Sequence, residues 1–360
     1  MSDLRVLMLV QLVDEGEWLR GFIVTWIRKL ADRVSHVDVV TLELGDAALP
    51  ANVSVYSMGK EKGFGRARLL LEFHRIMAHI GRDADVYFSH MTPLYTLIAA
   101  PYAALFHKPQ VMWFVHRSVT PILRLAHKAA ARVVTASPES YGILGDKVDV
   151  LGHGIDLEQF KPSRGAPEGR LILSVGRLAP IKNHEALLEG AARLFERPGF
   201  ENVQIAIAGG TTGEFPEYER GLRTLAESLG VSNRVEFLGA VPPSKMPTLY
   251  QRAALSVNLC PTGGMDKAVL ESMACGLPVL VHNRTFLPLL GQDAGRLWSE
   301  TLEAGILADR LAALLTLNEA EREAISQRLL ATVREGYSLD ALIDRLVRVF
   351  ETLQEGHPGI

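Results

Sequence analysis

The sequence has few cysteines and no long apolar run. Cys260 and Cys275 are the only cysteines, and their spacing matches no metal-binding motif, so we expect reduced core thiols in a cytoplasmic protein. The apolar stretch 94–106 is interrupted by Pro101 and is shorter than the ~20 residues that a membrane-spanning helix needs. The N-terminal residues lead into an apolar strand without a signal-peptide cleavage site. Neither secretion nor insertion into a bilayer is therefore expected.

An excess of charge of either sign is also absent. The formal net charge is −3, from 38 basic and 41 acidic residues, which gives no electrostatic reason to expect nucleic acid as a partner. The content of 48% hydrophobic and 22% charged residues is ordinary for a soluble globular protein. A chain of 360 residues is too long for one ordinary core and fits two domains of roughly 150–200 residues each.

Apolar runs alternate with amphipathic helices along the whole chain. Runs such as 5–11 (RVLMLVQ) are unbroken, which is typical of parallel strands buried on both faces. The repeated strand–helix–strand pattern predicts doubly wound parallel sheets, an α/β fold class. A polar segment rich in glycine and proline, 161–170, suggests a linker between two Rossmann-like domains. The expected strands are 5–11, 37–42, 53–57, 85–89, 110–115, 132–136, 147–151, 171–175, 203–208, 234–238, 255–259 and 278–281, and the expected helices are 21–34, 93–106, 121–130, 184–196, 216–229, 244–252 and 339–354.

The stretch 261–279 (PTGGMDKAVLESMACGLPV) predicts a glycine-rich loop that opens into a short helix. Asp266 is a suitable N-cap residue, and Gly276 and Pro278 supply a helix stop. One helical face is apolar and should be buried: Val269, Leu270, Met273 and Ala274. Because free N–H groups and the helix dipole both attract negative charge at a helix N-terminus, we expect a phosphorylated ligand here.

Two cations follow the strand expected at 171–175. Arg177 and Lys182 lie in one strand-to-helix loop at the carboxyl edge of the predicted sheet. Two cations beside a helix N-terminus suit a diphosphate, although a pair of solvated loop cations would look the same in isolation. With the glycine loop in the same domain, the phosphate interpretation is favoured, and the two segments would hold one polyphosphate from two sides.

Four segments of the chain carry recognisable patterns, namely HGIDLEQFKP (153–162), LILSVGRLAPIKNHEALLEGAARL (171–194), RVEFLGAV (234–241) and VLESMACGLPV (269–279). They resemble motifs of the retaining nucleotide-sugar glycosyltransferases of family 4, the group 1 glycosyltransferases with the GT-B fold. The segments occur in the expected order, and the combination of GHGID with TGGMDKAVLE resembles a bacterial and archaeal subgroup. The resemblance implies an acceptor-binding domain at 1–165, a nucleotide-sugar-binding domain at 166–337, and a helix at 338–360 that returns to the first domain.

The resemblance also implies a role for each matching residue. Arg177 and Lys182 would hold the donor diphosphate and stabilise the charge on the leaving nucleotide. Glu271 matches the second glutamate of the family's Glu-x7-Glu motif, which bonds the ribose hydroxyls. His116, after the strand at 110–115, would lie beside the donor sugar. The remaining donor-binding residues would be Gly16, Gly21, Gly209, Gly210, Phe237, Leu238, Gly239, Gly263, Gly264, Met265 and Lys267.

The sequence departs from the family pattern at the first glutamate, where Gly263 stands. Asp266 could supply a carboxylate to the same region as a catalytic group, or it could only cap the helix. Lys267 could contact phosphate or could pair with Glu271 one turn later. His90, after the strand at 85–89, could shape the acceptor pocket or be structural.

Two further features of the sequence each allow a functional and a structural interpretation. The triplet Asp83-Ala84-Asp85 has the form of a metal motif, but it precedes a strand instead of ending one, so we expect a turn and no required metal. The stretch from Lys60 to Arg82 holds six basic and two acidic residues together with an apolar face formed by Leu69, Leu70, Phe73 and Met77. Such a helix could lie on an anionic membrane surface, or it could be a solvated helix that packs on the sheet.

These observations predict a glycosyltransferase. It would transfer a sugar from a UDP- or GDP-sugar to a saccharide or lipid-linked acceptor with retention of configuration, without a metal cofactor, in the cytoplasm or at the inner face of the membrane. Two alternatives stay open: a nucleotide-sugar epimerase with the same fold, and a catalytically silent homologue that binds nucleotide sugar and supports a partner enzyme.

Overall fold

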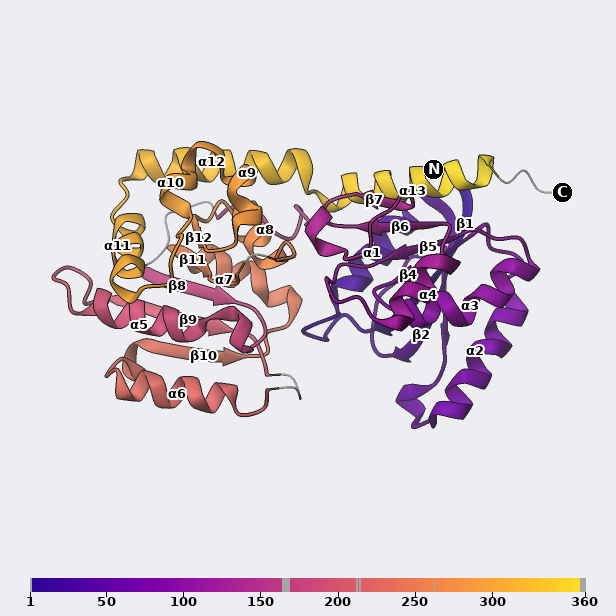
Figure 1. The fold of residues 1–360 in the computed structure, drawn as a ribbon, viewed down its shortest axis with the longest axis horizontal. Helices are drawn as coiled ribbons and strands as arrows, with labels where there is room; N and C mark the ends of the chain where they lie inside the picture. Colours follow the sequence, from indigo (N-terminus) through magenta and orange to yellow (C-terminus); the bar gives the residue numbers. More distant parts are fainter. Residues whose placement is uncertain (1, 164–168, 212, 214, 262, 357–360) are drawn as a thin grey trace. The chain divides into compact units, whose positions relative to one another are not determined.

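The computed structural model (Figure 1) describes residues 2–163, 169–211, 213, 215–261 and 263–356. Internal contacts divide the chain into two units, Met1–Gly154 with Ser338–Ile360, and Ile155–Tyr337. The boundary expected between residues 165 and 166 lies outside the described residues. The division by contacts instead comes earlier, between Gly154 and Ile155. The motif HGID therefore contributes to both units.

The first unit contains a seven-stranded parallel sheet. Its central strand β1 pairs with β2 on one side and β4 on the other, and Val6 is in register with Val37 and Val86. Residues 6–10 of β1 are fully buried, as expected for a strand with parallel neighbours on both sides and helices on both faces, and this burial explains the unbroken apolar run. The strand order is β3-β2-β1-β4-β5-β6-β7, with bounds β1 Ser2–Val13, β2 Val34–Leu44, β3 Val53–Ser57, β4 Val86–His90, β5 Gln110–Trp113, β6 Arg132–Thr135 and β7 Val148–Val150.

Five α-helices cover this sheet, and one of them comes from the C-terminal end of the chain (Figure 1). Helix α13 buries Leu342, Leu346 and Phe350 in the same core cluster as β1 and α1. Arg33 fixes it further by donating to Asp340 (2.6 Å) and Asp344 (3.0 Å). The helices are α1 Phe22–Ala31, α2 Arg66–Ile80, α3 Pro93–Leu105, α4 Pro121–Ala129 and α13 Leu339–Glu355, with 3₁₀ turns at Lys60–Lys62 and Pro138–Ser140.

The apolar face expected for α2 is partly wrong. Phe73 and Met77 are buried against the sheet, as the helical spacing predicts, but Leu70 is 44% exposed. The buried stripe continues instead through Ile76 and Ile80. The helix thus both packs on the sheet and presents leucines to solvent. No helix in the described ranges is long and apolar enough to cross a bilayer.

The second unit contains a five-stranded parallel sheet in the order β10-β9-β8-β11-β12. From β8 the chain adds β9 and β10 on one side, and it then crosses to place β11 on the other side of β8. The strand order therefore reverses between β8 and β11, and ligands of open α/β sheets bind at the carboxyl ends of strands at such a point. The strands are β8 Arg170–Val175, β9 Val203–Ala208, β10 Val235–Gly239, β11 Leu255–Asn258 and β12 Val279–Val281.

The helices of the second unit begin and end at the capping residues that the sequence contains. Asp266 caps α8 by accepting a hydrogen bond from the backbone N–H of Ala268, and Gly276 (φ 68°) follows the helix in the left-handed conformation. Asn318 and Glu321 form a capping box at the start of α12. The α-helices are α5 His184–Phe195, α6 Tyr218–Ser228, α7 Met246–Arg252, α8 Lys267–Ala274, α9 Leu287–Leu290, α10 Ala294–Leu297, α11 Ala304–Leu315 and α12 Glu319–Gly336.

The loops after β8 and β9 approach closely at two glycines. Gly209 has φ 153°, and a Cβ atom built on it would lie 1.8 Å from the carbonyl oxygen of Gly176. The backbone N–H of Gly209 also donates to the carbonyl oxygen of Gly239 (2.8 Å). Glycine is therefore required at position 209 for the carboxyl ends of three neighbouring strands to meet.

We expect Gly209→Ala to lower the free energy of unfolding of the second unit by about 2–3 kcal/mol, because the new methyl group would clash with backbone in a conformation that alanine disfavours. Urea unfolding monitored by circular dichroism measures the change. Gly213→Ala in the same loop is the control, since its Cβ meets no atom within 4 Å, and it should stay within ~0.5 kcal/mol of wild type. Equal stability of the two variants would contradict this account of the loop.

Candidate functional site

Predicted site residues gather at the carboxyl edge of the second sheet. Arg177 and Lys182 follow β8, Gly209 and Gly210 follow β9, and Gly239 ends β10. The glycine loop follows β11 and leads to α8. Parallel strands all end at one edge, so the sheet topology brings these loops together from segments that are far apart in the sequence.

The centre of this edge is an ion pair between Lys182 and Asp266. The ammonium group of Lys182 donates to Oδ2 of Asp266, and Asn258 donates to the same oxygen (2.9 Å). The other oxygen, Oδ1, accepts from the backbone N–H of Ala268 (3.2 Å). One carboxylate therefore joins the loop after β8, the end of β11 and the first turn of α8.

Burial and pairing act in opposite directions on these two groups. Burial alone would raise the pKa of the Asp266 carboxyl, but the charge of Lys182 and the hydrogen bonds from Lys182, Asn258 and Ala268 together outweigh burial and lower this pKa below its usual value. Burial alone would lower the pKa of the Lys182 ammonium, but the charge of Asp266 raises it. Both groups are therefore ionised across the ordinary pH range, and the pair is a fixed dipole at the start of α8.

Two backbone features hold Lys182 in place. Gly176 (φ 153°) leaves room for the lysine, because a Cβ atom there would lie 3.0 Å from Cε of Lys182. Asn183 adopts the left-handed conformation (φ 51°) and donates through Nδ2 to the carbonyl oxygen of Leu259 (2.8 Å). The loop after β8 is thus tied to the loop after β11 by a hydrogen bond as well as by the ion pair.

Glu271 and Lys267 lie on the first two turns of α8. The hydroxyl of Tyr250 donates to Oε2 of Glu271 (3.0 Å). Burial raises the pKa of Glu271, and the charge of Lys267 opposes this rise. Burial lowers the pKa of Lys267, opposed first by Glu271 and then by Asp156. The opposite charges of Lys267 and Glu271 thus stabilise each other, and a contact of Lys267 with phosphate stays a prediction.

The glycine loop before α8 is held by residues that follow β12. The carbonyl oxygen of Gly263 accepts from Oγ1 of Thr285 (3.0 Å), and that of Gly264 accepts from Nδ2 of Asn283 (3.2 Å). Met265 is buried. These contacts fix the backbone of the loop. Because residue 263 is a glycine, the loop supplies no carboxylate at that position.

Three of the predicted donor-binding residues, Phe237, Leu238 and Gly239, lie on β10. The ring of Phe237 is half-buried and lies under the guanidinium of Arg223, 4.5 Å away. Leu238 is packed against the core of the unit. The carbonyl oxygen of Gly210 accepts from the backbone N–H of Leu178 (3.0 Å). A contact of Phe237, Leu238 or Gly239 with a base stays a prediction.

The predicted residues of the first unit occupy varied positions. His116 is exposed after β5, and its Nδ1 accepts from the backbone N–H of Ser118 (3.1 Å). The N–H of Gly16 donates to Oδ1 of Asp14 (2.9 Å). At Gly21 a Cβ atom would lie 2.5 Å from the carbonyl oxygen of Glu17, so only glycine fits there. These residues shape the loop after β1 and the end of β5, and their contact with a donor stays a prediction.

His90 ends β4 and is 6% exposed, within an aromatic cluster. Its ring lies 5.0 Å from that of Trp26, edge to face, and 6.3 Å from that of Trp113, stacked. The ring is therefore part of the packing between α1 and the sheet. Its expected contact with an acceptor stays a prediction.

The triplet that has the form of a metal motif is structural. The carboxylate of Asp85 accepts from the backbone N–H of Arg5 (2.8 Å), and the N–H of Asp83 donates to the carbonyl oxygen of Ile80 (3.1 Å). The triplet thus forms the turn that was expected between α2 and β4. In the part of the chain that the structure describes, no three His, Cys, Asp or Glu side chains are grouped to hold a metal ion.

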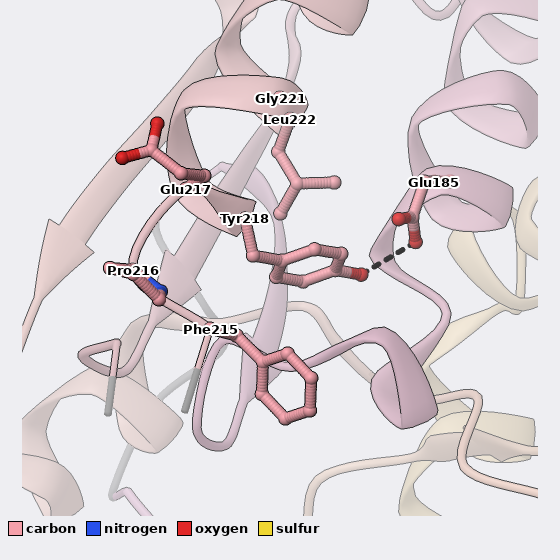
Figure 2. Close-up of a pocket in the computed structure, with 7 residues that line it drawn as sticks. All are labelled: Glu185, Phe215, Pro216, Glu217, Tyr218, Gly221 and Leu222. Atoms are coloured by element: carbon pink, nitrogen blue, oxygen red, sulfur yellow. Dashed lines mark hydrogen bonds between the residues drawn. The ribbon is translucent and has the colours of Figure 1, made fainter. Parts of the chain in front are cut away.

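A pocket of about 560 Å³ lies near the starts of α5 and α6 (Figure 2). Tyr218 donates to Oε2 of Glu185 (2.6 Å) across it, and Phe215 and Leu222 add apolar surface. None of the predicted donor-binding residues lines this pocket.

The partners that hold the site together are not visible in the sequence. Asn258 and Tyr250 each bond to a predicted site residue and belong to no recognised motif. Asn183 lies in the motif at 171–194, but its bond to the carbonyl oxygen of Leu259 depends on the fold. Asn258 carried a signal, because a polar residue at the end of an apolar strand run often faces the ligand edge of a sheet. Tyr250 carried none, because a tyrosine on an amphipathic helix is usually part of a core.

We expect Asp266→Ala to lower the free energy of unfolding by about 3–4 kcal/mol at neutral pH, because it leaves Lys182 buried without its counter-charge and removes the helix cap. Asp266→Asn should cost about 1 kcal/mol less, since the amide oxygen still accepts from Ala268. Chemical denaturation of each variant measures these losses. Glu300→Ala is the control, because its pair with Arg284 is exposed, and it should change stability by less than ~0.5 kcal/mol.

The same variants give a pH test. A carboxyl whose pKa is lowered on folding stabilises the protein above its unfolded pKa, and this contribution is lost as the pH falls through the folded pKa. The stability gap between wild type and Asp266→Asn should therefore be constant near neutrality and close only below about pH 3.8, the ordinary value from which this pKa is lowered. A gap that closes between pH 5 and 7 would contradict the ion pair.

The chain is similar in sequence to known glycosyltransferases. Residues 156–328 match the family described as glycosyl transferases group 1. The chain is 31% identical over 238 residues to D-inositol 3-phosphate glycosyltransferase of Thermomonospora curvata, a match that covers 59% of this chain and 53% of that protein. It is 32% identical over 212 residues to the protein of the same name from Mycobacterium bovis, covering 56% and 43%. The chain thus spans about half the length of the curated relatives that it matches.

Solved structures share the fold over nearly the whole chain. Anabaena HepE in complex with UDP and glucose superposes with a TM-score of 0.75 at 16% identity, covering 97% of this chain and 100% of that one. Sucrose-phosphate synthase from Thermosynechococcus elongatus gives 0.77 at 16% identity, covering 98% and 100%. With two parallel-sheet α/β units and such neighbours, the predicted GT-B fold is confirmed. The chain has the GT-B fold, and its residues 156–328 are similar to the family described as glycosyl transferases group 1.

Proposed function

We propose that this protein is a glycosyltransferase that takes a sugar from a nucleoside diphosphate donor. The observation that carries the proposal is the anion site, defined as Arg177, Lys182 and the first turn of α8, at the point where the strand order of the second sheet reverses. A helix N-terminus beside two cations suits a diphosphate. The group 1 match over residues 156–328 and the relatives named as glycosyltransferases support the same reaction.

The residues of the anion site would do the electrostatic work of the transfer. As the bond between sugar and phosphate breaks, negative charge grows on the leaving nucleoside diphosphate. Arg177 is exposed and able to reach that charge, and Lys182 is fixed at the start of α8. Cations that are already in place stabilise such a charge without reorganisation during the step. Glu271 would accept hydrogen bonds from the ribose hydroxyls.

The proposal includes a hexosyl donor and transfer with retention of configuration. Both oxygens of Asp266 are engaged, by Lys182 and Asn258 and by the N–H of Ala268, so this carboxylate is poorly placed to attack a sugar as a nucleophile. Gly263 supplies no carboxylate either. We therefore favour attack of the acceptor on the same face of the sugar that the leaving group occupies, with the donor phosphate as base. The acceptor would be a saccharide or a lipid-linked saccharide bound by the first unit.

A panel of UDP- and GDP-sugars, each incubated with and without saccharide and lipid-linked acceptors, tests the proposal by release of the nucleotide. Release that depends on an acceptor supports a transferase. Release or isomerisation of the donor without any acceptor would indicate an epimerase instead. Binding in a thermal-shift assay without release under any condition would indicate a catalytically silent homologue, since a ligand of the folded state raises the melting temperature by binding alone.

We expect Lys182→Ala to lower kcat/KM for the donor at least ~100-fold, because one fixed cation at a developing phosphate charge contributes roughly 3 kcal/mol to the transition state. Steady-state kinetics with the donor identified in the panel measures the loss, and circular dichroism checks the fold. Arg193→Ala is the control, because Arg193 lies exposed near the other end of α5. Wild-type activity in Lys182→Ala would refute the site assignment.

We also propose peripheral contact of the stretch from Lys60 to Arg82 with anionic lipid on the cytoplasmic face of a membrane. Leu71 is 66% exposed and Leu70 is 44% exposed on α2, and Arg66 and Arg68 are exposed nearby. Exposed leucines beside arginines suit a surface of acyl chains and anionic headgroups.

Leu71→Glu should reduce co-sedimentation with vesicles that contain phosphatidylglycerol at least ~5-fold, because it removes apolar contact and adds a like charge. The readout is the bound fraction at fixed lipid. Leu144→Glu, at another exposed leucine of the same unit (90%), should bind as wild type does. Failure of the wild-type protein to sediment with these vesicles would end the proposal.

A further inference from the structure

Glu271 has a buried hydrogen-bond donor beside it. Tyr250 lies on α7, is 1% exposed, and places its hydroxyl 3.0 Å from Oε2 of Glu271. The carbonyl oxygen of Ala268 is slightly farther from the same hydroxyl, at 3.2 Å. A phenol has one proton to donate, and a carboxylate is the stronger acceptor. The hydroxyl therefore donates to Glu271.

The position of this hydroxyl is fixed by its surroundings. The ring of Tyr250 packs edge to face against Phe160, with centroids 6.0 Å apart, inside the core of the second unit. Burial, and then the charge of Glu271, raises the pKa of Tyr250 well above its ordinary value of 10, so the phenol keeps its proton at any working pH. A buried ring on a packed helix gives the carboxylate a donor that does not move.

A fixed donor matters because the last torsion of a glutamate is broad. A carboxylate that is to accept hydrogen bonds from two neighbouring hydroxyls must hold one orientation, and a freely rotating one must be ordered when the ligand binds. With Oε2 bonded to Tyr250, the rotation of the Glu271 carboxylate is restricted before any ligand arrives.

We propose that Tyr250 is the positioning residue for Glu271, and that it sets the preference of the site for ribonucleotides over nucleotides without ribose hydroxyls. This inference rests on the proposed function, in which Glu271 accepts the ribose hydroxyls. The effect of Tyr250 should therefore appear only with ligands that carry those hydroxyls.

The second unit offers a matched control. Tyr218 also donates to a glutamate, Oε2 of Glu185, at 2.6 Å, and both residues line the pocket near the starts of α5 and α6 (Figure 2). Tyr218→Phe thus removes the same oxygen atom and the same type of hydrogen bond as Tyr250→Phe, at a glutamate that has no proposed role.

The experiment titrates the full-length chain with UDP and with 2′,3′-dideoxy-UDP by calorimetry, or with GDP and its dideoxy analogue if the wild type prefers guanine. Tyr250→Phe should weaken binding of the ribonucleotide about 10-fold and leave binding of the dideoxy nucleotide nearly unchanged, because a hydrogen bond to a carboxylate contributes at least ~1.4 kcal/mol. Tyr218→Phe should bind both nucleotides as wild type does. In a Glu271→Ala background, Tyr250→Phe should have no further effect.

Three results would overturn the inference. Equal weakening of both nucleotides by Tyr250→Phe, or failure of that variant to fold, would assign Tyr250 a structural role. An unchanged ribose preference in a folded Tyr250→Phe would show that Glu271 is positioned by other groups. A wild-type chain that binds neither UDP nor GDP would overturn the proposed function itself, and this failure is separate because it appears before any variant is made.

Discussion

The site of the second unit depends on one buried carboxylate. Asp266 caps α8, accepts from Asn258 at the end of β11, and pairs with Lys182 from the loop after β8. Another polar side chain could make any one of these interactions. Only a carboxylate at position 266 makes all three at once. Since a buried ion pair is costly to desolvate and is destabilising when half of it is removed, the geometry of the loops and the charge of Asp266 depend on each other. The group that orders the site therefore also brings a negative charge to it.

Much of the fold follows from the chain's local patterns. The alternation of unbroken apolar runs with amphipathic helices predicted every strand of both sheets. Strands of a parallel sheet that is buried on both faces are continuous apolar runs, which are easy to distinguish from amphipathic helices. Strand ends were placed less well. The strand expected at 5–11 runs from Ser2 to Val13, and the boundary between the units lies directly after Gly154, before the segment rich in glycine and proline that suggested a linker. Boundaries depend on contacts with distant segments, which a local pattern does not contain.

The sequence predicts which loops form the site, but it does not predict which side chains in those loops bond to one another. Strand order brings Lys182 and Asp266 to one edge, although they are 84 positions apart, and each was identified from its own local motif. Their pairing was not foreseen, because either residue alone is explained by a simpler role, as a solvated cation or as a helix cap. The contact of Tyr250 with Glu271 was hidden for a related reason. A core tyrosine on a helix shows its function only through the partner of its hydroxyl, 21 positions away.

Gly263 stands where the family pattern has a carboxylate. In the structure, Asp266 supplies a negative charge three residues later, and Lys182 already balances this charge. In the proposed transfer, an incoming diphosphate would first meet the exposed Arg177 and the N–H groups at the start of α8, and it would share Lys182 with Asp266. Attraction to the bound donor would thereby be reduced. The charge that develops on the leaving group would draw on the same lysine more strongly as the bond breaks. Under the proposed function, an internal counter-ion of this kind would favour the transition state over the bound donor, which is the condition for catalysis rather than for tight binding alone.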